Sequence, residues 1–382
     1  MQTFYRLRKK AIHKVTGVVS LHPVYESRGS VLLSYLTQAF LLSPPELEKV
    51  RHTNYWECRE IAYAFLEAGY NVDVINWDNS AFKPRKTYAF CLDIQHNLER
   101  FASLLGPNCI KIFFIEGSHW LFQNTAEYTR LLNLQRRRGI VLTPQRNVVP
   151  NHAIEHADYV IGLGNGFVHN TYSFSKKIIA PIALSTMTTF SSPAQKDFDA
   201  CRKNFVWLGG GGAVHKGLDL VLECFATMPD YSLTVCGPVH AEKDFAAAYS
   251  KELFETPNIR TVGRIDVRGK QFAEIVAKSL ALIYPSCSEG QSGSVVTAMH
   301  AGLIPIISRA SGVDADEFGI MLEQSSPEEI KTAVLALSSL PADVLAQKAK
   351  TTWKYAREHH TRERFARTFR EFIRTIMETH HL

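Results

Sequence analysis

Short apolar runs alternate with amphipathic stretches along almost the whole chain, and this alternation limits the folds that it can adopt. A helix is clearest at 56–68, where apolar residues recur at helical spacing and Gly69 follows as a stop. Strands that alternate with helices in this way are typical of parallel, doubly wound sheets. The strands predicted in the first half are Val31–Tyr35, Val72–Trp77, Tyr88–Asp93, Ile110–Ile115, Ile140–Thr143 and Tyr159–Leu163.

A stretch rich in Ser, Thr and Pro at 185–203 interrupts the pattern and is predicted to link two domains. The chain has 382 residues, which is enough for two domains of ordinary size. We expect an N-terminal Rossmann-like domain at 1–190 and a C-terminal one at 200–360, with a helix at about 360–382 packed back on the first. The second series has predicted strands at Phe205–Leu208, Ser232–Cys236, Ala281–Tyr284 and Ile304–Ile307, and predicted helices at 218–228, 245–254, 272–278, 294–301 and 327–338, with one or two polar helices at 353–380.

Open parallel sheets bind ligands at the carboxyl ends of their strands. Two α/β domains that face each other would therefore leave a cleft with one substrate on each side. This arrangement suits an enzyme that transfers a group between two substrates.

The composition excludes several classes of protein. Hydrophobic residues make up 46% of the chain and charged residues 21%, which is the balance of a globular protein. No apolar run approaches the ~18–20 residues that span a bilayer. The basic start of the chain lacks the apolar core of a signal peptide, so a cytoplasmic location is expected. Seven cysteines without a CxxC pair argue against a disulfide framework and against a zinc site.

The net charge of +6 favours anionic partners such as nucleotides or phospholipids. One basic cluster, Arg6, Arg8, Lys9 and Lys10, interleaves with aromatic residues, and two interpretations stay open: a solvated helix end or a peripheral contact with the inner membrane face. A second cluster, 136–138, is predicted to be a solvated helix end. No nucleic-acid-binding motif is present, so nucleic acid is not an expected partner.

The first motif with chemical meaning is FVWLGGGGAVHKG at 205–217. A predicted strand runs into four glycines and then into His215, Lys216 and Gly217 at a helix start. Glycines let the backbone approach a ligand closely, and the free N–H groups of a helix start suit a phosphate. The motif therefore predicts a phosphate site, with a plain glycine turn and an exposed lysine as the alternative. Replacing Lys216 by alanine is expected to slow the reaction and to leave fold stability almost unchanged.

The second motif is YPSCSEGQSGSVVTAMHAGLIP at 284–305. A polar loop follows a predicted strand and leads into a helix near Ser294. Glu289 in this loop is an acceptor for sugar hydroxyls, placed beside the N–H groups of the helix start. The alternative is that Ser292 or Ser294 caps the helix and that Glu289 is a surface residue. Two such glycine-bearing junctions in one half of the chain favour a diphosphate clamp.

These segments carry a resemblance to a known family. GGGGAVHKGLDLVLECF, the VGRI turn at Val262–Ile265 and ALIYPSCSEGQSGSVVTAMHAGLIPII resemble retaining glycosyltransferases of the GT-B fold, family four (glycosyl transferases group 1). The resemblance covers 205–308 and is mostly topological in the first half. It implies two Rossmann-like domains facing across a cleft, a nucleotide-sugar donor in the C-terminal half and transfer without a metal or other cofactor.

The resemblance also implies roles for individual residues. Lys216 would grip the donor phosphates, and Glu289 would be the first of a pair of family glutamates and a catalytic residue. The second glutamate is replaced by Thr297, and an arginine that the family often has six residues before the lysine is replaced by Gly210. The donor-binding set implied in this way is Gly210, Gly211, Gly212, His215, Lys216, Gly217, Gly237, Ile265, Ser288, Glu289, Gly290, Gln291, Ser292, Gly293, Ser294 and Thr297.

In the first half, the family often places a histidine just after the strand that corresponds to Ile110–Ile115. His119 is the candidate for this catalytic position, with Glu116 as the residue there if the loop is shifted, and a loop histidine without catalytic role as the further alternative. Asn54, Gln123 and Asn124 are candidates for contact with the acceptor.

The function predicted is retaining transfer of a sugar from a UDP- or GDP-sugar to a glycan or lipid-linked acceptor, by an enzyme resembling hexosyltransferases of polysaccharide biosynthesis. Two alternatives remain at this stage. One is a nucleotide-sugar epimerase on the same fold. The other is a protein without catalytic activity that binds a nucleotide sugar or a glycan, which the residues at 210 and 297 keep open.

Overall fold

The computed structural model describes residue 13 and residues 15–382. The basic cluster predicted to contact a membrane lies outside these residues. Within them no helix is long and apolar enough to cross a bilayer.

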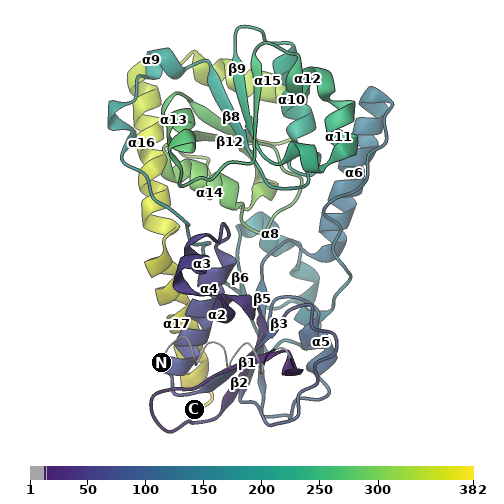
Figure 1. The fold of residues 1–382 in the computed structure, drawn as a ribbon, viewed down its shortest axis with the longest axis vertical. Coiled ribbons are helices and arrows are strands. Elements are labelled where there is room, and N and C mark those ends of the chain that lie inside the picture. The colour runs from purple at the N-terminus through teal and green to yellow at the C-terminus, as the bar shows by residue number, and fades with distance from the viewer. Residues whose placement is uncertain (1–12, 14) are drawn as a thin grey trace.

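The described chain forms two α/β units, each built on one sheet (Figure 1). In the first sheet the strand order is β1-β3-β2-β4-β5-β6-β7, and all neighbours are parallel except β1, which pairs antiparallel with β3. The strands are β1 (Val18–Leu21), β2 (Ser30–Tyr35), β3 (Asn71–Asn76), β4 (Phe90–Asp93), β5 (Ile110–Ile115), β6 (Tyr159–Gly162) and β7 (Ile179–Pro181). The helices of this half are α2 (Gln38–Leu41), α3 (Pro44–Glu48), α4 (Asn54–Glu67), α5 (Asn97–Phe101), α6 (Trp120–Arg138), α7 (Ala153–His156) and α8 (Gly166–Asn170).

The second sheet is wholly parallel, in the order β10-β9-β8-β11-β12-β13. This is the order of a Rossmann sheet, in which the strand sequence reverses between the first and fourth strands, here β8 and β11. The strands are β8 (Asn204–Leu208), β9 (Ser232–Cys236), β10 (Ile259–Gly263), β11 (Ala281–Tyr284), β12 (Ile304–Ser308) and β13 (Ile320–Leu322). The helices are α9 (Phe198–Cys201), α10 (Leu218–Ala226), α11 (Lys243–Ala248), α12 (Ser250–Phe254), α13 (Lys270–Ala277), α14 (Gly293–His300), α15 (Pro327–Ser338), α16 (Ala342–His359) and α17 (Arg362–Thr379).

The predicted fold of two doubly wound α/β domains is confirmed, with corrections at particular elements. The predicted strand Ile140–Thr143 is wrong: these residues pair with no strand, Val141 is exposed, and the N–H of Thr143 donates to the Asp244 carboxylate instead. The segment predicted as one helix at 245–254 is two short helices, α11 and α12. The exact domain limits stay a prediction, although the two sheets lie within them.

Two helical segments cross from one unit to the other (Figure 1). The long C-terminal arm packs α16 on α14 of the second unit and α17 on α4 of the first. Phe365 and Phe369 of α17 make edge contacts with Trp56 and Phe65. Arg370 pairs with Glu60 and Glu67 on α4, which adds polar contacts around this aromatic packing.

Helix α6 crosses in the other direction, and its last turn adds to the prediction for 136–138. Arg137 pairs with the fully buried Asp219 at 2.8 Å and with Glu223 at 3.0 Å, both on α10. Arg138 pairs with Glu252 on α12 at 2.6 Å. Arg136 bonds to Asn133. All three arginines are exposed, as predicted for a helix end, but Arg137 and Arg138 also make contacts between the domains.

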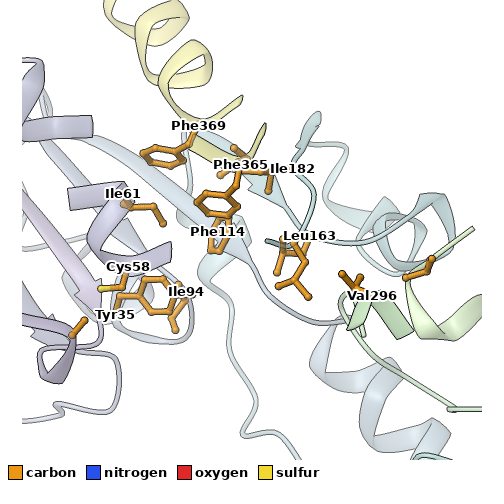
Figure 2. Close-up of a cluster of buried hydrophobic side chains, with 14 of the residues drawn as sticks. Tyr35, Cys58, Ile61, Ile94, Phe114, Leu163, Ile182, Val296, Phe365 and Phe369 are labelled. Carbon is orange, nitrogen blue, oxygen red and sulfur yellow. The ribbon is translucent and has the colours of Figure 1, made fainter. Parts of the chain in front are cut away.

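The hydrophobic core also continues across the domain boundary. Figure 2 shows one buried cluster that runs from Tyr35 and Cys58, through Phe114 and Phe365, to Val296 on α14 of the second unit. A shared core of this kind holds the carboxyl ends of the two sheets close together.

Candidate functional site

The site predicted in the C-terminal half lies where the strand order reverses. The glycine-rich segment 209–212 follows β8, and the polar loop 285–292 follows β11, which is the neighbour of β8 in the sheet. Ligands of doubly wound proteins bind at this point because the two connecting segments diverge there. The sheet therefore brings the two sequence motifs, 68 or more residues apart, to one edge.

Lys216 and Glu289 form the centre of this site. The Lys216 ammonium donates to Glu289 Oε1 at 2.5 Å and to the Tyr284 hydroxyl at 2.9 Å. Tyr284 and Ser286 also donate to the same Oε1, at 2.8 and 3.2 Å. Burial is the largest single influence on Glu289 and raises its pKa, but the positive groups around it, Lys216 first and then His215 and Arg146, together outweigh burial and lower that pKa to about 2. Glu289 is therefore ionised, and its second oxygen, Oε2, has no hydrogen-bond partner among the described residues.

The lysine differs from its prediction in one respect. Its side chain is only 9% exposed, and its charge is already matched by Glu289. Removing one partner of a buried ion pair typically costs ~3–5 kcal/mol, because the other charge is left unpaired. Instead of leaving fold stability unchanged, Lys216→Ala is now expected to lower it.

His215 lies between the two motifs and is 1% exposed. Its Nε2 donates to the carbonyl of Ser288 at 2.5 Å, and its Nδ1 is buried without a partner in the described chain. Burial lowers the pKa of His215 to about 4, so the ring is neutral at pH 7. This bond ties the glycine-rich segment to the loop of Glu289.

The N–H groups of the glycine-rich segment are partly occupied. Those of Gly212 and Ala213 donate to the buried Glu242 carboxylate, at 2.5 Å for Gly212 and 3.0 and 3.2 Å for Ala213. Gly210 and Gly211 are exposed. Sequence analysis gave no signal for Glu242, which lies after a different strand, β9.

Most other residues of the predicted donor set hold the site together. Gln291 accepts from the N–H of Leu184 at 2.6 Å and donates to the carbonyl of Gly312 at 3.2 Å. Ser292 caps α14, as its alternative interpretation held. The remaining members lie close by: Gly217 precedes α10, Ser288 lies in the polar loop, Gly237 and Ile265 follow β9 and β10, and Gly293, Ser294 and Thr297 lie in α14. Thr297 is buried in α14.

The loop of Glu289 touches the N-terminal domain directly. A Cβ on Gly290 would collide with the backbone of Glu116 and Gly117, so no larger residue fits there in this arrangement. Ser118 donates to the carbonyl of Glu289 at 2.9 Å, and Arg130 donates to the carbonyl of Pro285 at 3.0 Å. At the level of these loops the two domains are in contact.

His119, the histidine candidate, makes its ring contacts inside the N-terminal domain. Its ring packs against Trp120, Tyr172 and Phe174, with centroids 4.9–5.5 Å apart. Burial, and then His152, lowers its pKa. None of these contacts joins it to Lys216 or Glu289, so its catalytic role stays a prediction.

Glu116, the alternative at that position, follows β5 and accepts from the Tyr35 hydroxyl at the end of β2. Burial, together with the nearby Glu57, raises the pKa of Glu116 to about 8. Burial likewise raises the pKa of Glu57 to about 7, although Ser185 donates to it twice.

Two of the residues predicted to touch an acceptor are engaged with a loop. Gln123 donates to the carbonyl of Arg146 at 2.6 Å, and Asn124 exchanges two hydrogen bonds with the backbone of Val148. The third, Asn54, begins α4 beside a cavity of about 770 Å³. The cavity lies at the carboxyl ends of β2 and β3, and its polar lining includes Gln38, Tyr55, Asn76 and Asp78. The acceptor role of all three stays a prediction.

In the described part of the chain, no group of three or more His, Cys, Asp or Glu side chains could hold a metal ion. The seven cysteines are free, and six of them are buried.

Comparisons with known proteins agree with this geometry. Residues 202–339 match the family described as Glycosyl transferases group 1. No curated protein matches the chain.

Among solved structures, sucrose-phosphate synthase from Thermosynechococcus elongatus superimposes with a TM-score of 0.65 at 13% identity, over 92% of this chain and 100% of that one. A glycosyltransferase from Rickettsia africae superimposes with a TM-score of 0.57 at 10% identity, over 93% of this chain and 99% of that one. Anabaena HepE, in complex with UDP and glucose, superimposes with a TM-score of 0.55 at 12% identity, over 92% of this chain and 99% of that one.

The fold of the whole chain is thus that of the GT-B glycosyltransferases, and the family match covers the domain that carries Lys216 and Glu289. The chain therefore has the two-domain fold of the GT-B glycosyltransferases, and residues 202–339 of its C-terminal domain match the model of glycosyl transferases group 1.

Proposed function

We propose that this protein is a retaining glycosyltransferase that moves a sugar from a UDP- or GDP-sugar to a glycan or lipid-linked acceptor. The bond between the anomeric carbon and the diphosphate breaks, the anomeric carbon bonds to an acceptor hydroxyl, and the proton of that hydroxyl is released. The products are a glycosylated acceptor and a nucleoside diphosphate.

The observation that carries this proposal is the state of Glu289. Three donors hold its Oε1, and Oε2 remains without a partner in the described chain. An ionised carboxylate held in this way accepts hydrogen bonds from sugar hydroxyls, and bonds to a charged group are worth ~1.5–3 kcal/mol each. The position agrees with a donor sugar bound where β8 and β11 diverge. HepE, which has the same fold, binds UDP and glucose.

Lys216 has two tasks in this proposal. It keeps Glu289 ionised, and it adds positive charge near the diphosphate that leaves. Positive groups fixed where negative charge develops stabilise a transition state, typically by ~3–4 kcal/mol for one group.

We assign the acceptor to the N-terminal domain, at the cavity beside Asn54. The amide, hydroxyl and carboxylate groups that line this cavity can form hydrogen bonds with the hydroxyls of a glycan. Leu36, Leu41 and Leu42 add an apolar wall. A lipid-linked acceptor would use the same wall.

The test is to incubate the protein with a panel of UDP- and GDP-sugars and to follow nucleotide release and the stereochemistry of the sugar. Slow release of nucleoside diphosphate, faster with a suitable acceptor and with the anomeric configuration kept, is the expected result. A new sugar stereochemistry without nucleotide release would identify an epimerase, and binding without turnover a binding protein. We also expect activity to survive EDTA, and a strict requirement for added manganese or magnesium would contradict the proposed metal-free transfer.

A further inference from the structure

The glycine-rich segment has little positive charge of its own to offer a diphosphate. Lys216 is paired with Glu289, and the N–H groups of Gly212 and Ala213 donate to Glu242. A diphosphate placed near two carboxylates would be repelled unless another cation were present. The position six residues before Lys216, Gly210, has no side chain to supply one.

Arg146 brings a cation to this place from the N-terminal domain. Its side chain lies over the glycine-rich segment: a Cβ built on Gly212 would be 2.6 Å from Cγ and 3.0 Å from Cδ of Arg146. Burial is the main cause of the low pKa of His215, and the Arg146 charge adds to it. After Lys216 and His215, the same charge helps to lower the pKa of Glu289. Arg146 therefore lies within electrostatic reach of both residues.

The backbone of Arg146 is anchored, whereas its charged group is not engaged. The N–H donates to both oxygens of Glu127, at 2.9 and 3.0 Å, and the carbonyl accepts from Gln123 at 2.6 Å. Glu127 and Gln123 are buried residues of α6. In the described chain the guanidinium has no hydrogen-bond or ion-pair partner, and the residue is exposed. Such anchoring lowers the entropy that is lost when the guanidinium binds a ligand.

We propose that Arg146 binds the diphosphate of the nucleotide sugar, so that the donor site is built from both domains. A guanidinium offers two parallel N–H donors to phosphate oxygens, and unlike Lys216 it is not already paired. This inference rests on the proposed function and adds to it the residue that recognises the charged part of the donor. It also explains why a site without an arginine at 210 retains a cation for the leaving group.

The test compares nucleotides with nucleosides. Affinities of Arg146→Gln for UDP, GDP, uridine and guanosine are measured by calorimetry at low and high salt. Affinity for the preferred nucleoside diphosphate should fall about ten- to hundredfold, while nucleoside affinity stays unchanged. Arg146→Lys keeps the charge but loses the two parallel donors, so its affinity for the nucleoside diphosphate should lie between those of the wild type and Arg146→Gln. Arg136→Gln is the matched control, because Arg136 is also exposed but touches only Asn133.

A second variant tests the same site from the other domain. A Cβ on Gly210 meets no atom within 4 Å, so the side chain of Gly210→Arg can start there without a clash at Cβ. In the Arg146→Gln background it should restore affinity for the nucleoside diphosphate. If the wild type binds and turns over a nucleotide sugar but Arg146→Gln binds the nucleoside diphosphate with unchanged affinity, this inference is overturned and the proposed function is not. A wild type that binds neither UDP nor GDP nor their sugars would refute the proposed function, and this inference with it.

Discussion

The two domains place the same pair of residues at the same kind of position, with opposite electrostatic results. In each domain a tyrosine that ends a strand donates its hydroxyl to a glutamate in or beside a loop at the domain boundary: Tyr284 to Glu289, and Tyr35 to Glu116. Lys216 joins the first pair, and its charge, with smaller contributions from His215 and Arg146, lowers the pKa of Glu289 to about 2 in spite of burial. The second pair has Glu57 nearby instead, and burial and this like charge raise the pKa of Glu116 to about 8.

The difference shows that burial alone does not decide the charge of a carboxyl group; the third partner does. The C-terminal pair is a fixed anion, suited to hydrogen bonds from a sugar. The N-terminal pair is mostly protonated at pH 7 and changes charge near neutral pH. The following substitutions test this contrast, from the largest expected effect to the smallest.

Glu289→Gln removes the anion and keeps the shape of the side chain. Turnover should fall by about 10²–10³, the scale of one lost electrostatic contact in a transition state. The variant should also lose most of the difference in affinity between the nucleotide sugar and the free nucleotide. Steady-state kinetics and calorimetry with both ligands measure these effects. Equal affinity of the wild type for both ligands would show that Glu289 does not face the donor sugar.

Lys216→Met makes the C-terminal pair resemble the N-terminal one, with a glutamate and a tyrosine but no lysine bonded to them. We expect the pKa of Glu289 to rise above its ordinary value and the free energy of unfolding to fall by ~3–5 kcal/mol. Urea unfolding at pH 7 measures the loss. Lys203→Met, at an exposed lysine over Tyr231, is the control and should cost less than ~1 kcal/mol. Equal stability of the two variants would mean that the buried ion pair is not held as described.

Glu116→Gln tests the N-terminal pair. A carboxyl whose folded pKa is raised stabilises the fold fully below its unfolded pKa, and this stability is lost as the pH rises toward about 8. Wild-type stability should therefore include a fall of up to ~1.4 kcal/mol per pH unit between the unfolded pKa and about pH 8, which flattens above pH 8 and which the variant lacks. Urea unfolding at pH 6.5, 7.5 and 8.5 measures both slopes, with Glu371→Gln as an exposed control. Parallel slopes in all three proteins would place Glu116 in contact with solvent.

His119→Ala is expected to have the smallest effect. The ring contacts three aromatic residues, so stability should fall by ~1–2 kcal/mol. Turnover should fall less than in Glu289→Gln, and donor affinity should stay within a few-fold. Thermal unfolding and kinetics on one preparation separate the two effects. A loss of turnover as large as that of Glu289→Gln, with stability unchanged, would make His119 a catalytic residue.

The sequence predicted the inner strands of both sheets but none of the edge strands. β1, β7, β10 and β13 each lie at an edge of a sheet. Inner parallel strands are buried on both faces and form continuous apolar runs, whereas an edge strand such as Ile259–Gly263 (IRTVG) has a polar, partly exposed pattern. The run Ile140–Thr143 was apolar enough to imitate a strand, yet it has no pairing partner.

The residues of the site likewise divide into those that the sequence could predict and those that it could not. Lys216 and Glu289 could be predicted because each belongs to a local strand–loop–helix pattern with a meaning of its own. Glu242 and Arg146 could not, because their roles depend on segments that meet only in the folded chain; the bond from Lys216 to Tyr284 is likewise formed only there. Arg146 lies 66 residues from Gly212 in the sequence, and nothing around it forms a motif.

Gly290 has a consequence for how this protein tolerates change. A Cβ on Gly290 would overlap the backbone of Glu116 in the other domain, so a methyl group there would push the two domains apart. Gly290→Ala should therefore have a larger radius of gyration in X-ray scattering and a lower thermal stability, because the core shared by the domains would be partly opened. Such a variant would show whether each domain can keep its fold when the contact between the domains is loosened. Substitutions in the shared core would disturb both the fold and the contact at once.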